Sequence, residues 1–74
     1  MKMYVLIEGS RAQIEEHLHQ IRGVDNVAEA NMVSAICQAI VLIDAPDLNA
    51  AERALLRIKQ IPGVRSASSS TVLS

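Results

Sequence analysis

The chain has 74 residues, of which 50% are hydrophobic, and its 7 Lys and Arg against 8 Asp and Glu give a formal net charge of −1 at pH 7. This length predicts one domain, residues 1–74, and the charge balance argues against direct nucleic-acid binding, which needs a clustered basic surface. No apolar run approaches the ~20 residues of a membrane span and there is no signal-peptide pattern, so we expect a cytoplasmic protein.

A core this small gives marginal stability, which disulfides, metals or association with further copies can supplement. The single cysteine cannot form an internal disulfide, and no Cys or His spacing fits a metal site. His17 and His19 lie two apart in a helical pattern and point in different directions, so one chain cannot place both on one metal. We therefore expect a homo-oligomer with no metal and no cofactor.

The first predicted strand covers residues 3–8, and the first predicted helix covers residues 11–22. Both faces of the strand are apolar, which is typical of a central strand covered on both sides. Ser10 and Gln13 fit the S-x-x-Q capping box at the start of the helix. The stripe expected to face the sheet consists of Ile14, Leu18 and Ile21.

The second predicted strand covers residues 24–32, and polar residues alternate along one of its sides, which indicates exposure. Asp25-Asn26 near its start suits a turn or a bulge. The link to the next strand, residues 32–35, contains neither Gly nor Pro, so we expect a longer loop or a bulged connection rather than a tight hairpin.

Residues 36–43 are the most apolar run and predict a central strand buried on both faces. We interpret Cys37 as a small buried hydrophobe, and Gln38 either as hydrogen-bonded in a subunit interface or as facing a pocket. Because the first strand is also apolar on both sides, including Tyr4, we expect a second copy to cover the sheet face opposite the helices.

The second predicted helix begins after Asp47 or Asn49, either of which can be its N-cap, and Pro62-Gly63 ends it. Its predicted buried stripe consists of Leu48, Ala51, Leu55 and Ile58, with Ala54 and Ile61 at the margin. Leu56 lies off the stripe and is a candidate for a second contact.

The last predicted strand covers residues 64–73, and residues 66–71 within it are nearly all small and hydroxylated. One interpretation is an exposed sheet edge that its hydroxyl groups keep soluble. The other is a hydroxyl-lined wall that hydrogen-bonds a polar ligand.

The sequence Gln20-Ile21-Arg22-Gly23-Val24 returns as Gln60-Ile61-Pro62-Gly63-Val64. Each copy predicts a helix C-terminus whose glycine takes positive φ before a strand. Similar apolar runs ending in an acid, residues 5–8 and 41–44, precede the two helices. The chain is therefore predicted to hold two strand–helix–strand units in tandem, βαββαβ.

Four segments carry a family resemblance: Tyr4-Val5-Leu6-Ile7, Ile21-Arg22-Gly23-Val24-Asp25-Asn26-Val27, residues 48–66 with Ile61-Pro62-Gly63-Val64, and Ser69-Ser70-Thr71-Val72-Leu73. Through them the whole chain resembles the effector-binding domain of the Lrp/AsnC family of transcription regulators, in the stand-alone form without a DNA-binding domain. The resemblance implies a ferredoxin-like α+β fold, an antiparallel four-stranded sheet with two helices on one face. It also implies pairing sheet to sheet as a dimeric α+β barrel, which in that family often assembles into rings of dimers.

The same resemblance implies binding of amino acids or related small effectors between subunits. We expect the ligand contacts in the link after the second strand and in the last strand, at Asn31, Met32, Ser34, Ala35, Arg65, Ser66, Ser68 and Ser70. The family usually has a Gly and an Asp in that link. Without this acid, the α-amino group of an amino acid loses its obvious charged partner.

Two alternatives stay open beside this function. A protein–protein interaction module or peptide-binding adaptor with no small-molecule effector would capture an extended segment along a free sheet edge. An enzyme would need a titratable group in a cleft, and the candidates are His17, His19, Glu8 and Asp44. The histidines look solvated and the acids look like strand ends, so we do not predict an enzyme.

Overall fold

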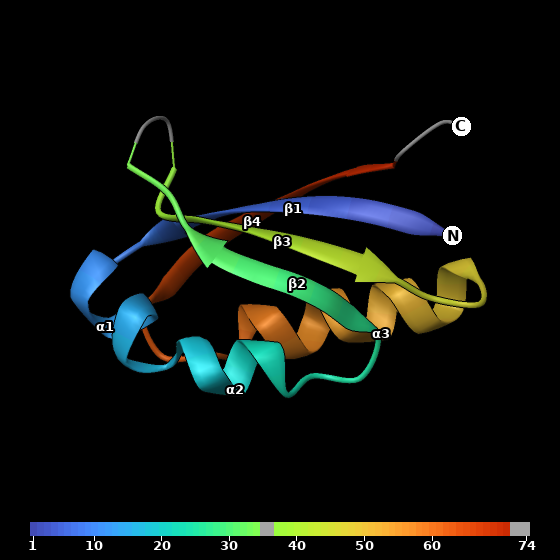
Figure 1. Cartoon of the computed structure of the whole chain (residues 1–74), viewed down its shortest axis with the longest axis horizontal. Helices are drawn as coiled ribbons and strands as arrows, with labels where there is room; N and C mark the ends of the chain where they lie inside the picture. Colours follow the sequence, from blue (N-terminus) through green and yellow to red (C-terminus); the bar gives the residue numbers. More distant parts are fainter. Residues whose placement is uncertain (35–36, 72–74) are drawn as a thin grey trace.

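The computed structural model describes residues 1–34 and 37–71. The elements in these residues are β1 (Lys2–Gly9), α1 (Arg11–Glu16), α2 (Leu18–Arg22), β2 (Val27–Met32), β3 (Ala39–Asp44), α3 (Leu48–Lys59) and β4 (Val64–Thr71). The strands form a four-stranded antiparallel sheet in the order β2-β3-β1-β4, and the helices cover one face of it (Figure 1). This arrangement confirms the predicted ferredoxin-like α+β architecture.

Strand β1 lies in the middle of the sheet, with β3 on one side and β4 on the other. Alternate residues of β1 point toward the helices and are buried, which confirms the prediction of a central strand. The core between sheet and helices is largely aliphatic; its largest fully buried side chains are Ile7, Ile14, Ile21, Ile43, Ile58, Val5 and Val41. The other face of the sheet carries no helix among the described residues.

The predicted helix over residues 11–22 is in fact two short helices, because the backbone leaves helical geometry at His17, with φ −104° and ψ 14°. The N–H of His17 donates to the carbonyl oxygens of both Gln13 (3.0 Å) and Ile14 (3.2 Å). The imidazole Nδ1 of His17 lies 2.8 Å from the same Gln13 oxygen. The backbone and the side chain of His17 therefore both contact this carbonyl group at the break between the helices. The predicted stripe is confirmed: Ile14 and Ile21 are fully buried, and Leu18 is half-buried.

Side chains cap two of the helices at their first turn. The hydroxyl of Ser10 accepts from the N–H of Gln13 at 3.4 Å, which confirms the Ser half of the predicted capping box. Of the two candidate N-caps for α3, Asp47 and Asn49, the N-cap in the structure is Asp47. Its Oδ1 accepts a hydrogen bond from the N–H of Ala50 at 2.8 Å.

The two repeated glycine turns differ in conformation. Gly63 has φ 94°, as predicted for a glycine after a helix. The same prediction is wrong for Gly23, which stays right-handed with φ −85° and ψ −6°. The left-handed residue of this turn is instead Asn26, with φ 74°, and asparagine is one of the few residues that tolerates this conformation.

Gly9 and Gly63 bring the β1–α1 and α3–β4 turns into contact. The N–H of Ser10 donates to the carbonyl oxygen of Gly63 at 3.0 Å. A Cβ atom added at Gly9, where φ is 155°, would overlap that carbonyl group. Glycine is therefore required at Gly9 by the close approach of the two backbones.

Strand β2 begins at Val27 rather than at residue 24 as predicted. The N–H of Val27 donates to the carbonyl oxygen of Val24 at 3.1 Å and closes a turn through Asp25-Asn26. The turn that this pair suited is thus confirmed, and a separate register shift against β3 lies between Val27 and Glu29. As predicted, β2 is more exposed than its neighbours, because it lies at an edge of the sheet.

Strand β3 begins at Ala39, so the predicted start at residue 36 is too early; Ile36 itself lies outside the described residues, as do residues 72–74 of the last predicted strand. Ala39 pairs with Ile7 at the end of the β1–β3 pairing, and the N–H of Gln38 donates to the carbonyl oxygen of Ile7 at 2.8 Å. The register shift of β1 at Glu8/Gly9 lies in its pairing with β4. Cys37 lies before the strand but is only 4% exposed, which confirms it as a small buried hydrophobe.

Helix α3 packs on the sheet through a face rotated from the predicted stripe. Its buried residues are Ala50, Ala51, Ala54 and Ile58. Leu48, predicted to be buried, is 49% exposed, and Leu55 is half-buried. Leu56 lies off the buried face and is 58% exposed, as expected from its position. Small alanine side chains let a helix approach the sheet closely, so the contact centres on them rather than on the leucines.

Candidate functional site

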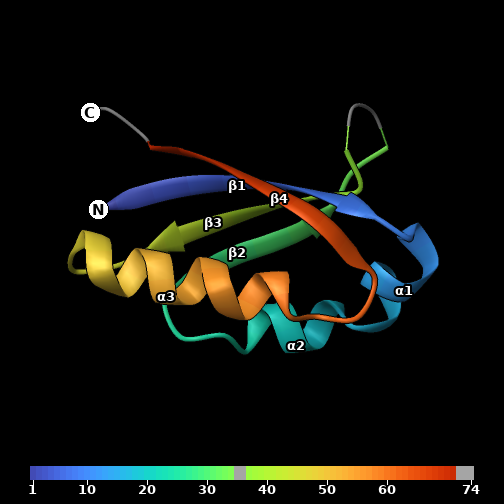
Figure 2. The same ribbon diagram turned by 180° about the vertical axis from the view of Figure 1, so that it is seen from behind.

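The sheet face opposite the helices has an apolar centre formed by Tyr4, Leu6, Ile40 and Leu42, and we call this surface the open face. Tyr4 pairs with Leu42, and Leu6 with Ile40, so the four side chains form two adjacent rows on β1 and β3. Tyr4 is 46% exposed and the other three are half-buried. Within the described part of the chain, no helix covers this patch (Figure 2).

Polar residues border the apolar centre on both sides. On β4, Ser66, Ser68 and Ser70 pair with Glu8, Leu6 and Tyr4, which places their hydroxyl groups on the open face, and all three are exposed. On β2, Asn31 and Glu29 pair with Ile40 and Leu42 and border the other side. The open face is therefore an apolar strip between a row of hydroxyl groups and a second polar row.

The ligand-contact residues predicted from the sequence lie on two opposite edges of the sheet. Three inter-strand spacings separate Asn31 on β2 from Ser68 on β4, which corresponds to about 14 Å. Arg65 is exposed beside the register shift of β4, and Met32 pairs with Ala39 on the helix side of the sheet. One chain therefore does not bring the two groups together.

Part of the predicted site lies in the connection between β2 and β3. Ser34 is exposed there, and Ala35 lies outside the described residues. The N–H of Val33 donates to the carbonyl oxygen of Gln38 at 3.0 Å, and the N–H of Gln38 donates to that of Ile7 at 2.8 Å. These bonds attach both ends of the connection to each other and to β1, on the side of the sheet away from the helices (Figure 1).

Arg11 is a residue of this region that sequence reasoning missed. Its Nη1 donates to the carbonyl oxygen of Val33 at 2.5 Å and so links the start of α1 to the β2–β3 connection. A signal was present in the sequence, because a cation in the first turn of a helix is electrostatically unfavourable and suggests another role for that side chain.

The residues considered for catalysis are not gathered into one site. Glu8 and Asp44 lie at opposite ends of the sheet, paired with Ser66 and Lys2 respectively. Across residues 1–34 and 37–71, no group of three or more His, Cys, Asp or Glu side chains is placed to hold a metal ion. None of the helices in these residues is long and apolar enough to cross a membrane.

Comparison with known proteins agrees with the resemblance found in the sequence. The profile of the Lrp/AsnC ligand binding domain matches residues 2–74. No curated protein matches the chain.

Several solved structures share the fold at low sequence identity. AsnC of E. coli is 19% identical with a TM-score of 0.87, and the alignment covers 99% of this chain and 50% of AsnC. TTHA0845 from Thermus thermophilus is 18% identical with a TM-score of 0.88, covering 99% of this chain and 92% of that one. The transcriptional regulator NMB0573 from Neisseria meningitidis, solved as a complex with L-Met, is 18% identical with a TM-score of 0.82, covering 99% and 49%. The chain thus spans about half the length of two of these regulators.

Proposed function

Because the chain belongs to the Lrp/AsnC ligand binding domain family, we propose that it is a regulatory domain that binds an amino acid or a related metabolite as a homo-oligomer. The observation that carries the proposal is the open face, whose apolar centre is bordered by hydroxyl groups. The effector would modulate a transcription regulator or an enzyme on another chain. A cytoplasmic location remains part of this prediction.

Pairing of two copies through their open faces accounts for the exposure of Tyr4 and for the half-buried side chains around it. Each Å² of apolar surface removed from water contributes about 25 cal/mol, and obligate dimers commonly bury more than ~2,000 Å² in total. A dimer of this kind would give a small core the additional burial that it needs.

The effector site would lie between subunits, because the predicted contacts in one chain are about 14 Å apart. In an oligomer, the edge of one copy that carries Asn31, Met32, Ser34 and Ala35 can approach the β4 edge of another copy. Ser66, Ser68 and Ser70 would there supply hydroxyl groups, and Arg65 a guanidinium group suited to a carboxylate.

The sheet-to-sheet pairing can be tested by a charge on the open face. Leu42→Asp should give a monomer or an unfolded chain at micromolar concentration, because the new carboxylate would have to be buried in the interface. Leu56→Asp is the matched control on the exposed side of α3 and should leave the oligomer intact. Light scattering and native mass spectrometry measure the mass; an unchanged oligomer of the folded Leu42→Asp protein would refute the pairing.

Effector binding can be tested by thermal unfolding with a panel of amino acids that begins with L-Met. A true effector at a hundredfold excess over its Kd should stabilise the folded state by about 2.7 kcal/mol. Ser68→Ala should weaken binding several-fold, whereas Ser69→Ala, on the opposite side of β4, should not. An intact oligomer that no panel member stabilises would contradict the effector function and favour the interaction module.

A further inference from the structure

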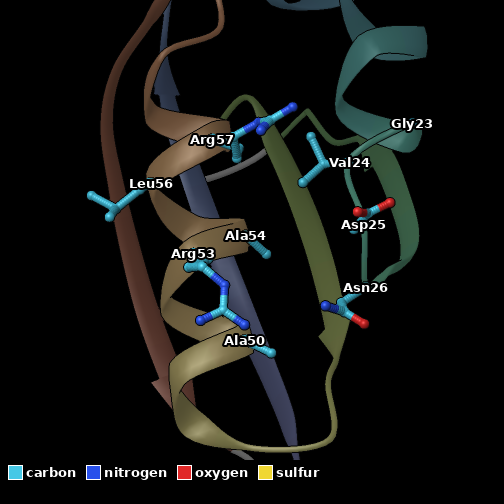
Figure 3. Close-up of a pocket in the computed structure, with 9 residues that line it drawn as sticks. All are labelled: Gly23, Val24, Asp25, Asn26, Ala50, Arg53, Ala54, Leu56 and Arg57. Carbon is cyan, nitrogen blue, oxygen red and sulfur yellow. The ribbon is translucent and has the colours of Figure 1, made fainter.

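A cleft of about 390 Å³ opens on the helix layer, between α3 and the turn that joins α2 to β2 (Figure 3). Ala50 and Ala54 of α3 and Val24 of the turn supply its apolar lining. This volume is in the range of small-molecule pockets, ~300–1,000 Å³. The cleft is separate from the open face, because the sheet lies between them.

Two arginines give the α3 wall of this cleft a positive charge. Arg53 and Arg57 are four residues apart, so they project from the same side of the helix, and both line the cleft. Arg11 and Arg22 donate to backbone carbonyl groups, whereas among the described residues no acceptor bonds the guanidinium group of Arg53 or Arg57. Their N–H donors therefore remain available, in the fork geometry that matches carboxylate and phosphate oxygens.

The opposite wall is a fixed turn with one amide and one acid. The carbonyl oxygen of Asn26 accepts from the N–H of Asp44 at 2.8 Å, which attaches the turn to β3. Asn26 and Asp25 both line the cleft, on the turn across from the α3 wall that carries the arginines (Figure 3). The cleft thus holds two positive charges against one negative charge, and the Asn26 amide adds a neutral donor.

We propose that Arg53, Arg57 and the Asn26 amide bind the oxyanion group of a small metabolite, a phosphate or a carboxylate, at a site distinct from the open face. The two guanidinium groups supply charge and paired donors. Asp25 opposes the anion from the other wall, so it limits affinity and favours ligands that carry a hydrogen-bond donor beside the oxyanion.

The test is a titration of the full chain in its native oligomer, followed by NMR of backbone amides and arginine side chains. The probes are inorganic pyrophosphate and succinate, with sodium chloride adjusted to constant ionic strength so that screening does not change. Saturable shifts at Asp25, Asn26 and the two arginines are expected. Saturation by pyrophosphate alone or by succinate alone supports the site and identifies the class of oxyanion.

Variants separate a built site from general electrostatic attraction. Arg53→Gln and Arg57→Gln should each weaken binding about tenfold, whereas Asp25→Asn should strengthen it. Lys59→Gln removes the same charge from the same helix outside this cleft and should leave binding unchanged. All four positions are exposed, so the variants should fold. Shifts that do not saturate, or equal losses for Lys59→Gln and the arginine variants, would overturn the proposal.

Discussion

Replacing Gly63 by alanine should destabilise the protein by about 2–5 kcal/mol. Gly63 has φ 94°, and a side chain in left-handed backbone costs roughly 1–2 kcal/mol. The new Cβ would also lie 2.5 Å from the Cβ of Gln13 and 3.2 Å from the N of Ile14. Both atoms belong to the first helical segment and cannot move by a rotamer change, so the overlap adds about 1–3 kcal/mol.

Gly23→Ala is the matched control, because Gly23 has the same place in the sequence repeat. Its φ of −85° suits alanine, and the nearest atoms to an added Cβ are 3.5 and 3.6 Å away. The substitution should be neutral or stabilise the protein by up to ~1 kcal/mol, since alanine restricts the unfolded chain.

Urea denaturation followed by far-UV circular dichroism would compare Gly63→Ala and Gly23→Ala. Both variants are measured at one protein concentration, because the proposed association of copies would contribute to stability. Gly63→Ala should lower the midpoint by at least ~1 M relative to Gly23→Ala. Equal midpoints for the two variants would refute the reasoning from backbone conformation.

The same titration tests three further predictions. Asp47→Ala should cost about 1 kcal/mol through the lost N-cap, and Asn49→Ala less than ~0.5 kcal/mol; equal losses would show that both residues cap the helix. Ile58→Ala should lower the free energy of unfolding by about 2–5 kcal/mol, because it leaves a cavity in the core. Leu56→Ala should change it by no more than ~0.5 kcal/mol, because Leu56 is exposed. A large effect at Leu56 would indicate that a partner covers this residue. Arg22→Met removes the 3.0 Å hydrogen bond from Nε to the Ala30 carbonyl oxygen of β2 and should lower the free energy of unfolding by about 1 kcal/mol. Measured separately, amide hydrogen exchange should become faster in β2 and not in β3.

Periodicity and capping chemistry were sufficient to predict the element order, the central position of β1 and the Ile14–Ile21 face of the first helical segment. These features depend on local pattern, because alternation and helical spacing determine which side chains can be buried together. The turn at Asp25-Asn26 was predicted for the same reason, since its residue types favour it.

The predictions that were wrong concern features that tertiary contacts determine. The repeat predicted equal conformations at Gly23 and Gly63, but only Gly63 lies against another turn that demands positive φ. The start of β3 depends on where its pairing with β1 ends, at Ile7 and Ala39, which no pattern within residues 36–43 contains. Leu48 was placed in the core by its spacing, whereas close packing of Ala50 and Ala54 rotates the helix away from it.

For the candidate sites, the sequence indicated which types of residue are present better than it indicated where they lie relative to one another. The hydroxyl row of β4 was recognised, and the register adds that alternate serines share the face of Tyr4 and Leu6. Arg53 and Arg57 were not among the predicted site residues, although their spacing of four on a predicted helix could have suggested a shared site. Their cleft depends on where the α2–β2 turn lies, which only the folded chain reveals.

The strand order β2-β3-β1-β4 has a consequence for the route by which the chain folds. Strand β1 lies between β3 and β4 and does not pair with β2, so neither tandem unit can complete a sheet from its own residues. During synthesis, β4 emerges after the other three strands of this sheet, so one side of β1 lacks its partner strand until then. The hydrogen-bonding groups on that side of β1 are meanwhile exposed to incorrect pairing. Folding should therefore be slower than the helical content suggests, because the sheet must close long loops before it gains their contacts.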